Sequence, residues 1–216
     1  KAVRIVDFIQ CSSISTNTFN GMQDAVHNTS GSTVLTTISG NSYIGVTNNL
    51  TNTTPNNATN VVTEYSADNT GVADCTTAFQ NALTALGTAT KGFLYVPPGT
   101  YRFDGTLEVK SPGNITVSAY GATLRRGDGS GSFTIFRNYT GSTNYPVNTG
   151  PSSLTFFGGT YDLNATTNQN GAQAISIAHS ENLLIEDVTV QNVFSAHGIE
   201  VNSTDVGEVR NCVFRG

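Results

Sequence analysis

Residues 74–103 read DCTTAFQNALTALGTATKGFLYVPPGTYRF, and the two halves of this stretch predict different elements. In the first half, apolar residues recur at the i, i+3, i+4 and i+7 spacing of one helix face, which predicts a helix over 76–86. Asp74 or Thr76 can cap its first turn by accepting a hydrogen bond from a free backbone N–H. Gly87 then ends the helix.

The second half of the stretch predicts a strand over 93–96 that ends at a Pro-Pro-Gly corner, because proline cannot donate to a sheet ladder. Short apolar strands then recur to the end of the chain, at steps in the 20–50-residue range typical of solenoids. One coil cannot bury its apolar inner face alone, so coils stack and share a core. The predicted strands are 93–96, 101–103 and 107–109; 115–118, 122–124 and 133–136; 154–157, 160–162 and 174–177; 184–186, 188–191 and 199–201; and 206–209 and 212–214.

A β-sandwich is the alternative, since it also consists of many short strands between turns. The single early helix and the long loops at 127–131 and 138–150 favour the solenoid.

The composition excludes several classes of function. The chain has 216 residues, a net charge of −5 and few charged residues (12 %), so it offers no basic patch for nucleic acid. No apolar run is long enough to insert into a membrane. Cys11, Cys75 and Cys212 lack metal-ligand spacing and are expected to be small buried apolar residues, so we expect neither a metal site nor a cofactor.

The N-terminal region, 1–60, is expected to be irregular and to serve as an attachment or linker region. Its sequence predicts strands at 3–9, 33–38 and 42–46 and a short helix at 19–26, an order that faintly repeats the later helix-and-strand unit. The polar segment 50–60 ends it. We expect 61–216 to hold the helix and the first coils of a solenoid that continues beyond 216.

The segments YSADNTGVAD (65–74) and LYVPPGTY (94–101), with the helix between them, resemble the start of the pectate-lyase-like superfamily. Members have a helix that closes the N-terminal end of a right-handed parallel β-helix. The resemblance therefore implies an all-β fold of this kind. The superfamily includes polysaccharide lyases, polygalacturonases, epimerases and phage tailspikes. The resemblance therefore does not indicate which activity this chain has.

The last third resembles the polygalacturonase-like branch, in FGGTYDLN (157–164), SENLLIEDVTVQN (180–192), AHGIEV (196–201) and VRNCVFRG (209–216). The family's first catalytic Asp falls on His197, and its Asp pair would follow Gly216. The resemblance thus implies that a complete polygalacturonase site is absent from these residues.

Carboxylates on neighbouring coils of a β-helix lie about 4.8 Å apart per strand step, which suits paired acid–base chemistry on sugars. The candidate catalytic residues are Glu200, His197 and Asp162, and the candidate substrate-binding residues are Tyr161 and Glu186. Each has a plainer alternative. Asp162 and Asn164 can stabilise a turn, Glu186 and Asp187 point to opposite faces, His197 can cap a corner, and Tyr161 can pack a loop.

Three functions fit the sequence. The first is the N-terminal part of a phage tailspike or receptor-binding protein. It would be a homotrimer in the virion that attaches to a tail or baseplate protein through 1–60 and binds, or also cleaves, host surface polysaccharide. The second is a secreted polysaccharide hydrolase or lyase of the polygalacturonase or pectate-lyase type, and the third is a non-catalytic structural β-helix.

Overall fold

The computed structural model describes residues 58–87, 91–109, 114–138 and 153–216, together with the strands β1–β7 in the chain before them. The chain divides into two compact units, Lys1–Ala58 and Thr59–Gly216. In the part that the structure describes, one segment is α-helical, and no helix has both the length and the apolar character needed to cross a bilayer.

In the first unit, short strands pair in parallel at a regular offset. Ile14 pairs with Ile38 and Phe19 with Tyr43, so equivalent positions recur at the same step along the chain. The region expected to be irregular therefore contains repeating parallel strands. These are β1 (Val3–Ile5), β4 (Asp24–Asn28) and β7 (Asn48–Asn52) in one sheet, β2 (Ile14–Ser15) with β5 (Ile38–Ser39), and β3 (Thr18–Asn20) with β6 (Ser42–Ile44).

The helix predicted over 19–26 is wrong, since β3 and β4 occupy most of that segment as strands. The predicted strands 3–9, 33–38 and 42–46 overlap β1, β5 and β6, and their remaining residues lie outside the described ones.

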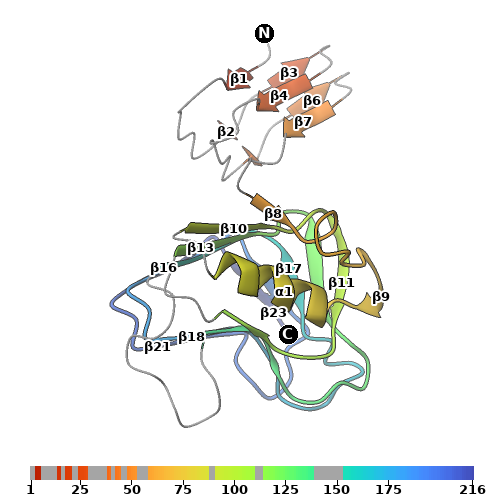
Figure 1. The fold of residues 1–216 in the computed structure, drawn as a ribbon, viewed down its shortest axis with the longest axis vertical. Coiled ribbons are helices and arrows are strands. Elements are labelled where there is room, and N and C mark those ends of the chain that lie inside the picture. The colour runs from red at the N-terminus through yellow and green to blue at the C-terminus, as the bar shows by residue number, and fades with distance from the viewer. Residues whose placement is uncertain are drawn as a thin grey trace. The chain divides into compact units, whose positions relative to one another are not determined.

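In the second unit, three parallel sheets run along the chain, and each turn of the chain adds one strand to each sheet (Figure 1). This is a right-handed parallel β-helix, as predicted, and the parallel pairing excludes the β-sandwich. The first sheet is β8 (Ala58–Asn60), β10 (Lys91–Tyr95), β13 (Asn114–Ser118), β16 (Ser153–Phe157), β19 (Asn182–Glu186) and β22 (Val206–Arg210). The second is β9 (Thr70–Asp74), β11 (Gly99–Phe103), β14 (Ala122–Arg126), β17 (Thr160–Asp162), β20 (Thr189–Gln191) and β23 (Val213–Arg215). The third is β12 (Leu107–Glu108), β15 (Thr134–Arg137), β18 (Gln173–Ala178) and β21 (Ile199–Asn202).

The coils differ in length, yet the strands stay in register. In the first sheet, Asn114 pairs with Ser153, whereas Asn182 pairs with Val206 after a much shorter stretch of chain. Where the structure describes both connections, the longer coil has its additional residues between the second and third sheets, at 163–172 after β17 compared with 192–198 after β20.

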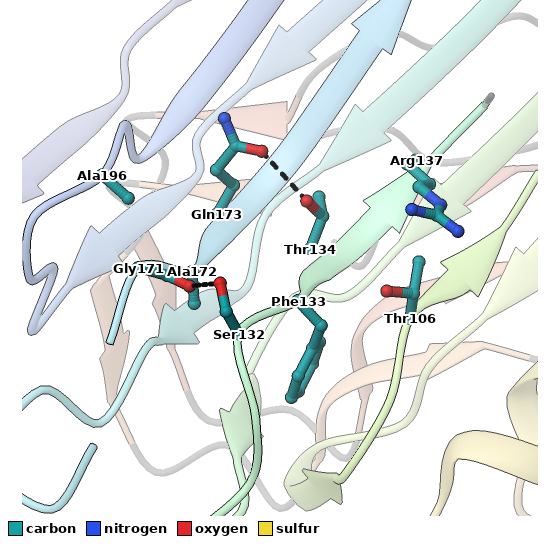
Figure 2. Close-up of a pocket in the computed structure, with 9 residues that line it drawn as sticks. All are labelled: Thr106, Ser132, Phe133, Thr134, Arg137, Gly171, Ala172, Gln173 and Ala196. Atoms are coloured by element: carbon teal, nitrogen blue, oxygen red, sulfur yellow. Dashed lines mark hydrogen bonds between the residues drawn. The ribbon is translucent and has the colours of Figure 1, made fainter. Parts of the chain in front are cut away.

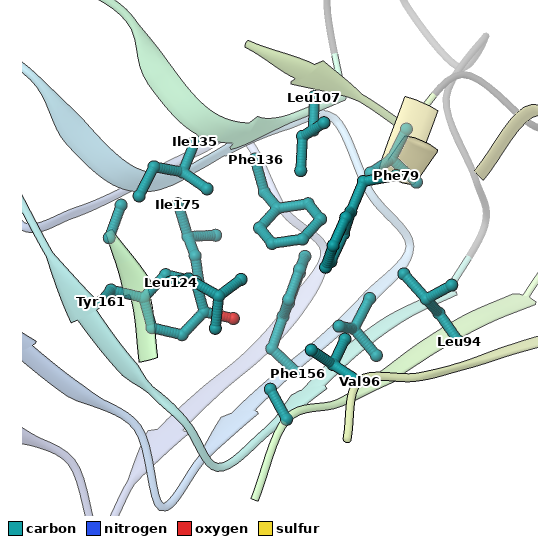
Figure 3. Packing of buried hydrophobic residues seen from close by; sticks show 14 of the residues in the cluster. Phe79, Leu94, Val96, Leu107, Leu124, Ile135, Phe136, Phe156, Tyr161 and Ile175 are labelled. Carbon is teal, nitrogen blue, oxygen red and sulfur yellow. The ribbon is translucent and has the colours of Figure 1, made fainter. Parts of the chain in front are cut away.

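The core is continuous because inward positions stack from coil to coil. Tyr101, Leu124, Tyr161 and Val190 form one such column in the second sheet, and all four are fully buried. The Phe136 ring packs edge-on against Phe156 and Tyr161, with ring centroids 5.5 and 6.2 Å apart (Figure 3).

The helix α1 (Thr76–Leu86) has the predicted bounds and packs against the N-terminal end of this core. Phe79 of this helix is fully buried. Its ring packs edge-on against the rings of Tyr101 and Phe103, with centroid distances of 5.4 and 4.9 Å. The N-cap residue is Cys75, which makes no side-chain cap hydrogen bond. Asp74, one residue earlier, accepts hydrogen bonds at its Oδ1 from the Thr76 backbone N–H (2.9 Å) and hydroxyl (2.6 Å). The helix thus shields the first coil from water.

Candidate functional site

The five residues that the sequence proposed do not form one site, because they lie on three different sheets. Glu200 is on β21 of the third sheet, and His197 is in the loop before that strand. Asp162 and Tyr161 are on β17 of the second sheet, while Glu186 is on β19 of the first. Glu200 and His197 lie close enough for the charge of His197 to lower the pKa of Glu200.

Tyr161 is inside the coil and has no exposed surface with which to contact a sugar. Strand alternation places Tyr161 in the inward column between Leu124 and Val190. The sequence alone did not show which face of the strand is inward, because the register between coils was unknown. We therefore remove Tyr161 from the candidate substrate-binding residues.

Asp162 stabilises the corner that follows β17. Its Oδ1 accepts hydrogen bonds from the Asn164 backbone N–H (2.9 Å) and from Nδ2 of Asn192 on the next coil (2.8 Å). Gln191 Nε2 donates to the other oxygen at 3.3 Å. These contacts match the turn-stabilising alternative and leave Asp162 bonded within the scaffold.

Glu186 pairs with Arg210 on the next coil at 2.8 Å, and Arg210 also bonds Glu208 at 3.2 Å. The adjacent Asp187 points elsewhere, where its Oδ2 accepts a hydrogen bond from the Tyr120 hydroxyl at 2.9 Å. The two carboxylates therefore serve different contacts, as expected, but the reason is that Asp187 follows the end of β19 with a positive φ of 58°, and not strand alternation.

Glu200 is the acidic residue with the strongest case for a site. Its Oε2 accepts hydrogen bonds from Gln173 Nε2 at 2.5 Å and from the Ser176 hydroxyl at 3.2 Å. The hydrogen bond from Gln173 lowers the pKa of Glu200, and Asn202, Ser176 and the nearby His197 contribute in the same direction. Glu200 is thus a fixed, ionised hydrogen-bond acceptor.

Beside Glu200, the third sheet carries a hollow of about 340 Å³ (Figure 2). Gln173 connects the two, since its Oε1 accepts a hydrogen bond from the Thr134 hydroxyl (3.0 Å) while its Nε2 binds Glu200. On another side of the hollow, Arg137 pairs with Glu108 at 2.8 Å. The lining residues are Thr106, Ser132, Phe133, Thr134, Arg137, Gly171, Ala172, Gln173 and Ala196.

Sequence reasoning missed the lining residues because coils of unequal length hide the register. Arg137 lies one residue after a predicted strand, and Gln173 one residue before another. The structure places Glu108, Arg137, Ser176 and Glu200 in one row. Alignment of the predicted third strands by their first residues would instead have placed Thr134 and Ile175 beside Glu108 and Glu200.

The carboxylates in this row are too far apart for paired acid–base chemistry. Glu108 and Glu200 are separated by three strand spacings, roughly 14 Å, whereas glycosidase pairs lie about 5–9.5 Å apart. The described residues also contain no group of three His, Cys, Asp or Glu side chains that could hold a metal ion. The hollow instead combines hydroxyl, amide and guanidinium groups with one aromatic ring, a combination suited to binding sugar hydroxyls.

Comparisons with known proteins agree with the fold. The family model described as "Rhamnogalacturonase A/epimerase, pectate lyase-like" matches residues 58–216 and confirms the resemblance found in the sequence. Plasmin and fibronectin-binding protein A of Streptococcus pneumoniae (strain ATCC BAA-255 / R6) is 26 % identical over 171 residues, which cover 72 % of this chain and 24 % of that protein. The A-module of the Azotobacter vinelandii mannuronan C-5 epimerase AlgE4 has a TM-score of 0.51 at 19 % identity, covering 73 % of this chain and 49 % of that one. The chain thus spans about a quarter and about half of these two proteins.

Proposed function

We propose, from the premise that this chain belongs to the rhamnogalacturonase A/epimerase, pectate lyase-like family, that it binds a polysaccharide in the hollow on its third sheet. The observation that carries the proposal is the linked set of polar side chains there. Thr134, Gln173 and Glu200 form a hydrogen-bonded series across three successive strands, and Arg137 supplies fixed donors beside it.

Such groups recognise sugars because each ring offers several hydroxyls that both donate and accept hydrogen bonds. Phe133 adds an apolar surface next to them, on which a sugar ring can pack. Binding without hydrolysis is favoured for the described residues, because Glu200 has no second carboxylate at catalytic distance along its row.

The biological setting that we propose is host attachment by a phage tailspike or receptor-binding protein. The separate N-terminal unit supports this setting, since it can serve as an attachment module for a tail or baseplate protein. The same chain would then assemble as a homotrimer on the virion. A secreted polysaccharide hydrolase or lyase is the alternative, and the Glu200–His197 neighbourhood is where its chemistry would have to start.

The binding proposal is tested by calorimetry with polygalacturonate, alginate, a neutral β-glucan and a bacterial capsular polysaccharide. Arg137→Ala and Gln173→Ala should each weaken binding of the best probe about tenfold, since each removes hydrogen bonds worth about 1.5 kcal/mol or more. Arg210→Ala is the matched control, because it removes a half-exposed arginine and its ion pairs from the first sheet. Equal binding by wild type and the two hollow variants would contradict the proposal.

Two further measurements separate the settings. Reducing ends that accumulate on incubation with these polysaccharides would favour the hydrolase or lyase. Light scattering on a sizing column should give three chains per particle for a tailspike, and a monomer would exclude that setting. Plasmin and fibronectin are tested as protein ligands in the same binding assay, because the pneumococcal relative is named for binding them.

A further inference from the structure

Arg126 is the most unusual charged residue in the described part of the chain. It lies at the end of β14 with 1 % of its surface exposed, at an inward position of a strand whose other inward residues are Ala122 and Leu124. A buried guanidinium is expensive unless its hydrogen bonds are satisfied. Burial lowers the pKa of Arg126, yet an arginine stays charged in proteins.

No carboxylate among the described residues pairs with Arg126, and neutral oxygens surround it instead. In the loop after β14, Nε donates to the Ser130 hydroxyl (3.2 Å), and Nη2 donates to the carbonyls of Ser130 (2.9 Å) and Gly131 (2.7 Å). From the next coil, Asn170 accepts through its carbonyl oxygen (3.1 Å, from Nη1) and its side-chain oxygen. The guanidinium therefore joins the corner loops of two successive coils.

These two loops lead directly into the hollow. Ser130 and Gly131 precede Ser132 and Phe133, and Asn170 precedes Gly171 and Ala172, all four of which line it (Figure 2). The Ser132 hydroxyl also donates to the Gly171 carbonyl, which adds a second link between the loops.

The Phe133 ring is held by the same residue. Arg126 Cζ lies 5.6 Å from the centroid of that ring, within cation–π distance. Arg126 thus touches both loops that lead into the hollow and the one aromatic residue that lines it, but it does not line the hollow itself.

We propose that Arg126 is a positioning residue: its guanidinium ties the 127–131 and 168–171 loops together and so sets the shape of the carbohydrate-binding hollow. This inference rests on the proposed function for the part that concerns binding. The part that concerns the loops does not, because their shape can be measured without any ligand.

The test compares Arg126→Ala, Arg126→Lys and Arg125→Ala in the full chain. Arg125 is the matched control, since it is the neighbouring residue on the same strand but is partly exposed and paired with Asp128 at 2.7 Å on the surface. Hydrogen exchange should speed up in peptides from 127–133 and 168–173 of Arg126→Ala, with β10, β11 and α1 unchanged. Arg125→Ala removes only a surface ion pair to Asp128 in the 127–131 loop, so it should leave 168–173 as in wild type and affect 127–133 much less than Arg126→Ala does. Arg126→Lys should give an intermediate result, because an ammonium group has three donors and cannot reach both loops as the planar fork does.

Free guanidinium gives a second readout that a general loss of stability would not produce. At about 20 mM, far below the molar concentrations that unfold proteins, it should restore slow exchange in Arg126→Ala by occupying the vacated cage. Equal concentrations of sodium chloride, or of urea with its similar shape and no charge, should not. Affinity for the best polysaccharide probe should fall about tenfold in Arg126→Ala and recover with guanidinium.

Each result bears on one part of the inference. Faster exchange spread evenly over all coils, or no change in the two loops, would overturn it. If Arg126→Ala does not fold, Asn170→Ala removes one of the side-chain acceptors and should loosen the 168–173 loop alone. Loosened loops with wild-type affinity would also overturn it while leaving the proposed function intact. Absence of polysaccharide binding by wild type itself would remove the proposed function, and the exchange data would still decide whether Arg126 shapes the hollow.

Discussion

The hydroxyl of Tyr120 donates a 2.9 Å hydrogen bond to the carboxylate of Asp187, two coils further along the β-helix. The coil between them contributes Gly158 at this corner, and the tyrosine ring covers it. A Cβ atom on Gly158 would lie only 2.5 Å from the ring, and the residue has a positive φ of 64°. One glycine thus allows two non-adjacent coils to bond directly.

Gly158→Ala should therefore destabilise the protein by about 2–4 kcal/mol, through backbone strain and overpacking together. Gly129→Ala is the matched control, since Gly129 has a similar φ of 70° but open space around it. It should cost only about 1 kcal/mol of strain. Denaturant unfolding measures the free energy of unfolding of both variants. Equal losses would contradict the prediction, because they would show that the Tyr120 ring moves aside at little cost. In a Tyr120→Ala background, the cost of Gly158→Ala should fall to that of the control.

Asn138 extends the third sheet with its side chain. Its Oδ1 accepts from the Ala178 N–H (2.8 Å), and its Nδ2 donates to the Ala178 carbonyl (2.7 Å), in a site with 4 % exposure. Asn138→Asp replaces the donor with an oxygen that faces that carbonyl, so we expect a loss of about 3 kcal/mol at neutral pH. Asn114→Asp, at an exposed strand start, should change the free energy of unfolding little. Similar values for the two variants would contradict this account.

Tyr161 and Tyr101 occupy the same inward column but differ in their hydroxyls. Tyr101 donates to the Pro97 carbonyl at 2.8 Å, whereas the buried hydroxyl of Tyr161 has no hydrogen-bond partner among the described residues. Tyr161→Phe should be neutral or stabilise the protein by about 1 kcal/mol, since it removes a buried polar group without a partner. Tyr101→Phe should destabilise it by about 1 kcal/mol. Thermal and denaturant unfolding of both variants checks that the two changes in the free energy of unfolding differ in sign. A clear loss of stability in Tyr161→Phe would overturn the prediction.

Asp68 organises the approach to the helix. Its carboxylate accepts hydrogen bonds from the hydroxyl and N–H of Thr70 and from the N–H groups of Val72 and Ala73. The Thr70 hydroxyl contributes most, and together these bonds lower the pKa of Asp68 to about 2. The folded-state pKa is below the unfolded one, so this stabilisation is complete above about pH 4 and is lost as the pH falls towards 2.

Melting temperatures of wild type and Asp68→Asn, measured from pH 7 to pH 2, test this. Wild type should melt higher at neutral pH, and the difference should shrink between about pH 4 and 2, when the wild-type carboxyl becomes protonated. A difference that stays constant over this range would show that the charge of Asp68 is not what stabilises the fold.

The fold could be predicted from local sequence because each coil repeats a local rule. The helix bounds and every strand predicted from 93 onward match observed elements, since apolar alternation and Gly or Pro corners are readable within a few residues. The N-terminal unit was misread at 19–26 because FNGMQDAV contains apolar residues at spacings that fit both helix and strand. There, pairing with the strands of the following repeat, β6 and β7, decided the outcome.

The candidate site could be predicted only in part, because it depends on which coil positions stack. Glu200 and His197 were identified as candidate catalytic residues, and the structure connects Glu200 to the hollow through Gln173. Arg137 and Arg126 were missed. Alternation from Ala122 and Leu124 places Arg126 inward and the partly exposed Arg125 outward. The oxygens that satisfy the buried guanidinium come from two loops, and the strand pattern does not reveal them.

The unequal coils with unbroken register have an evolutionary consequence. Because strand pairing holds across the long step from Asn114 to Ser153 as well as across the short one from Asn182 to Val206, the chain between strands can change in length while the strands keep their register. A lineage could reshape the proposed polysaccharide-binding surface by lengthening or shortening the segments between strands, with little loss of foldability. For engineering, the same property marks the corners as positions where foreign peptides can be grafted.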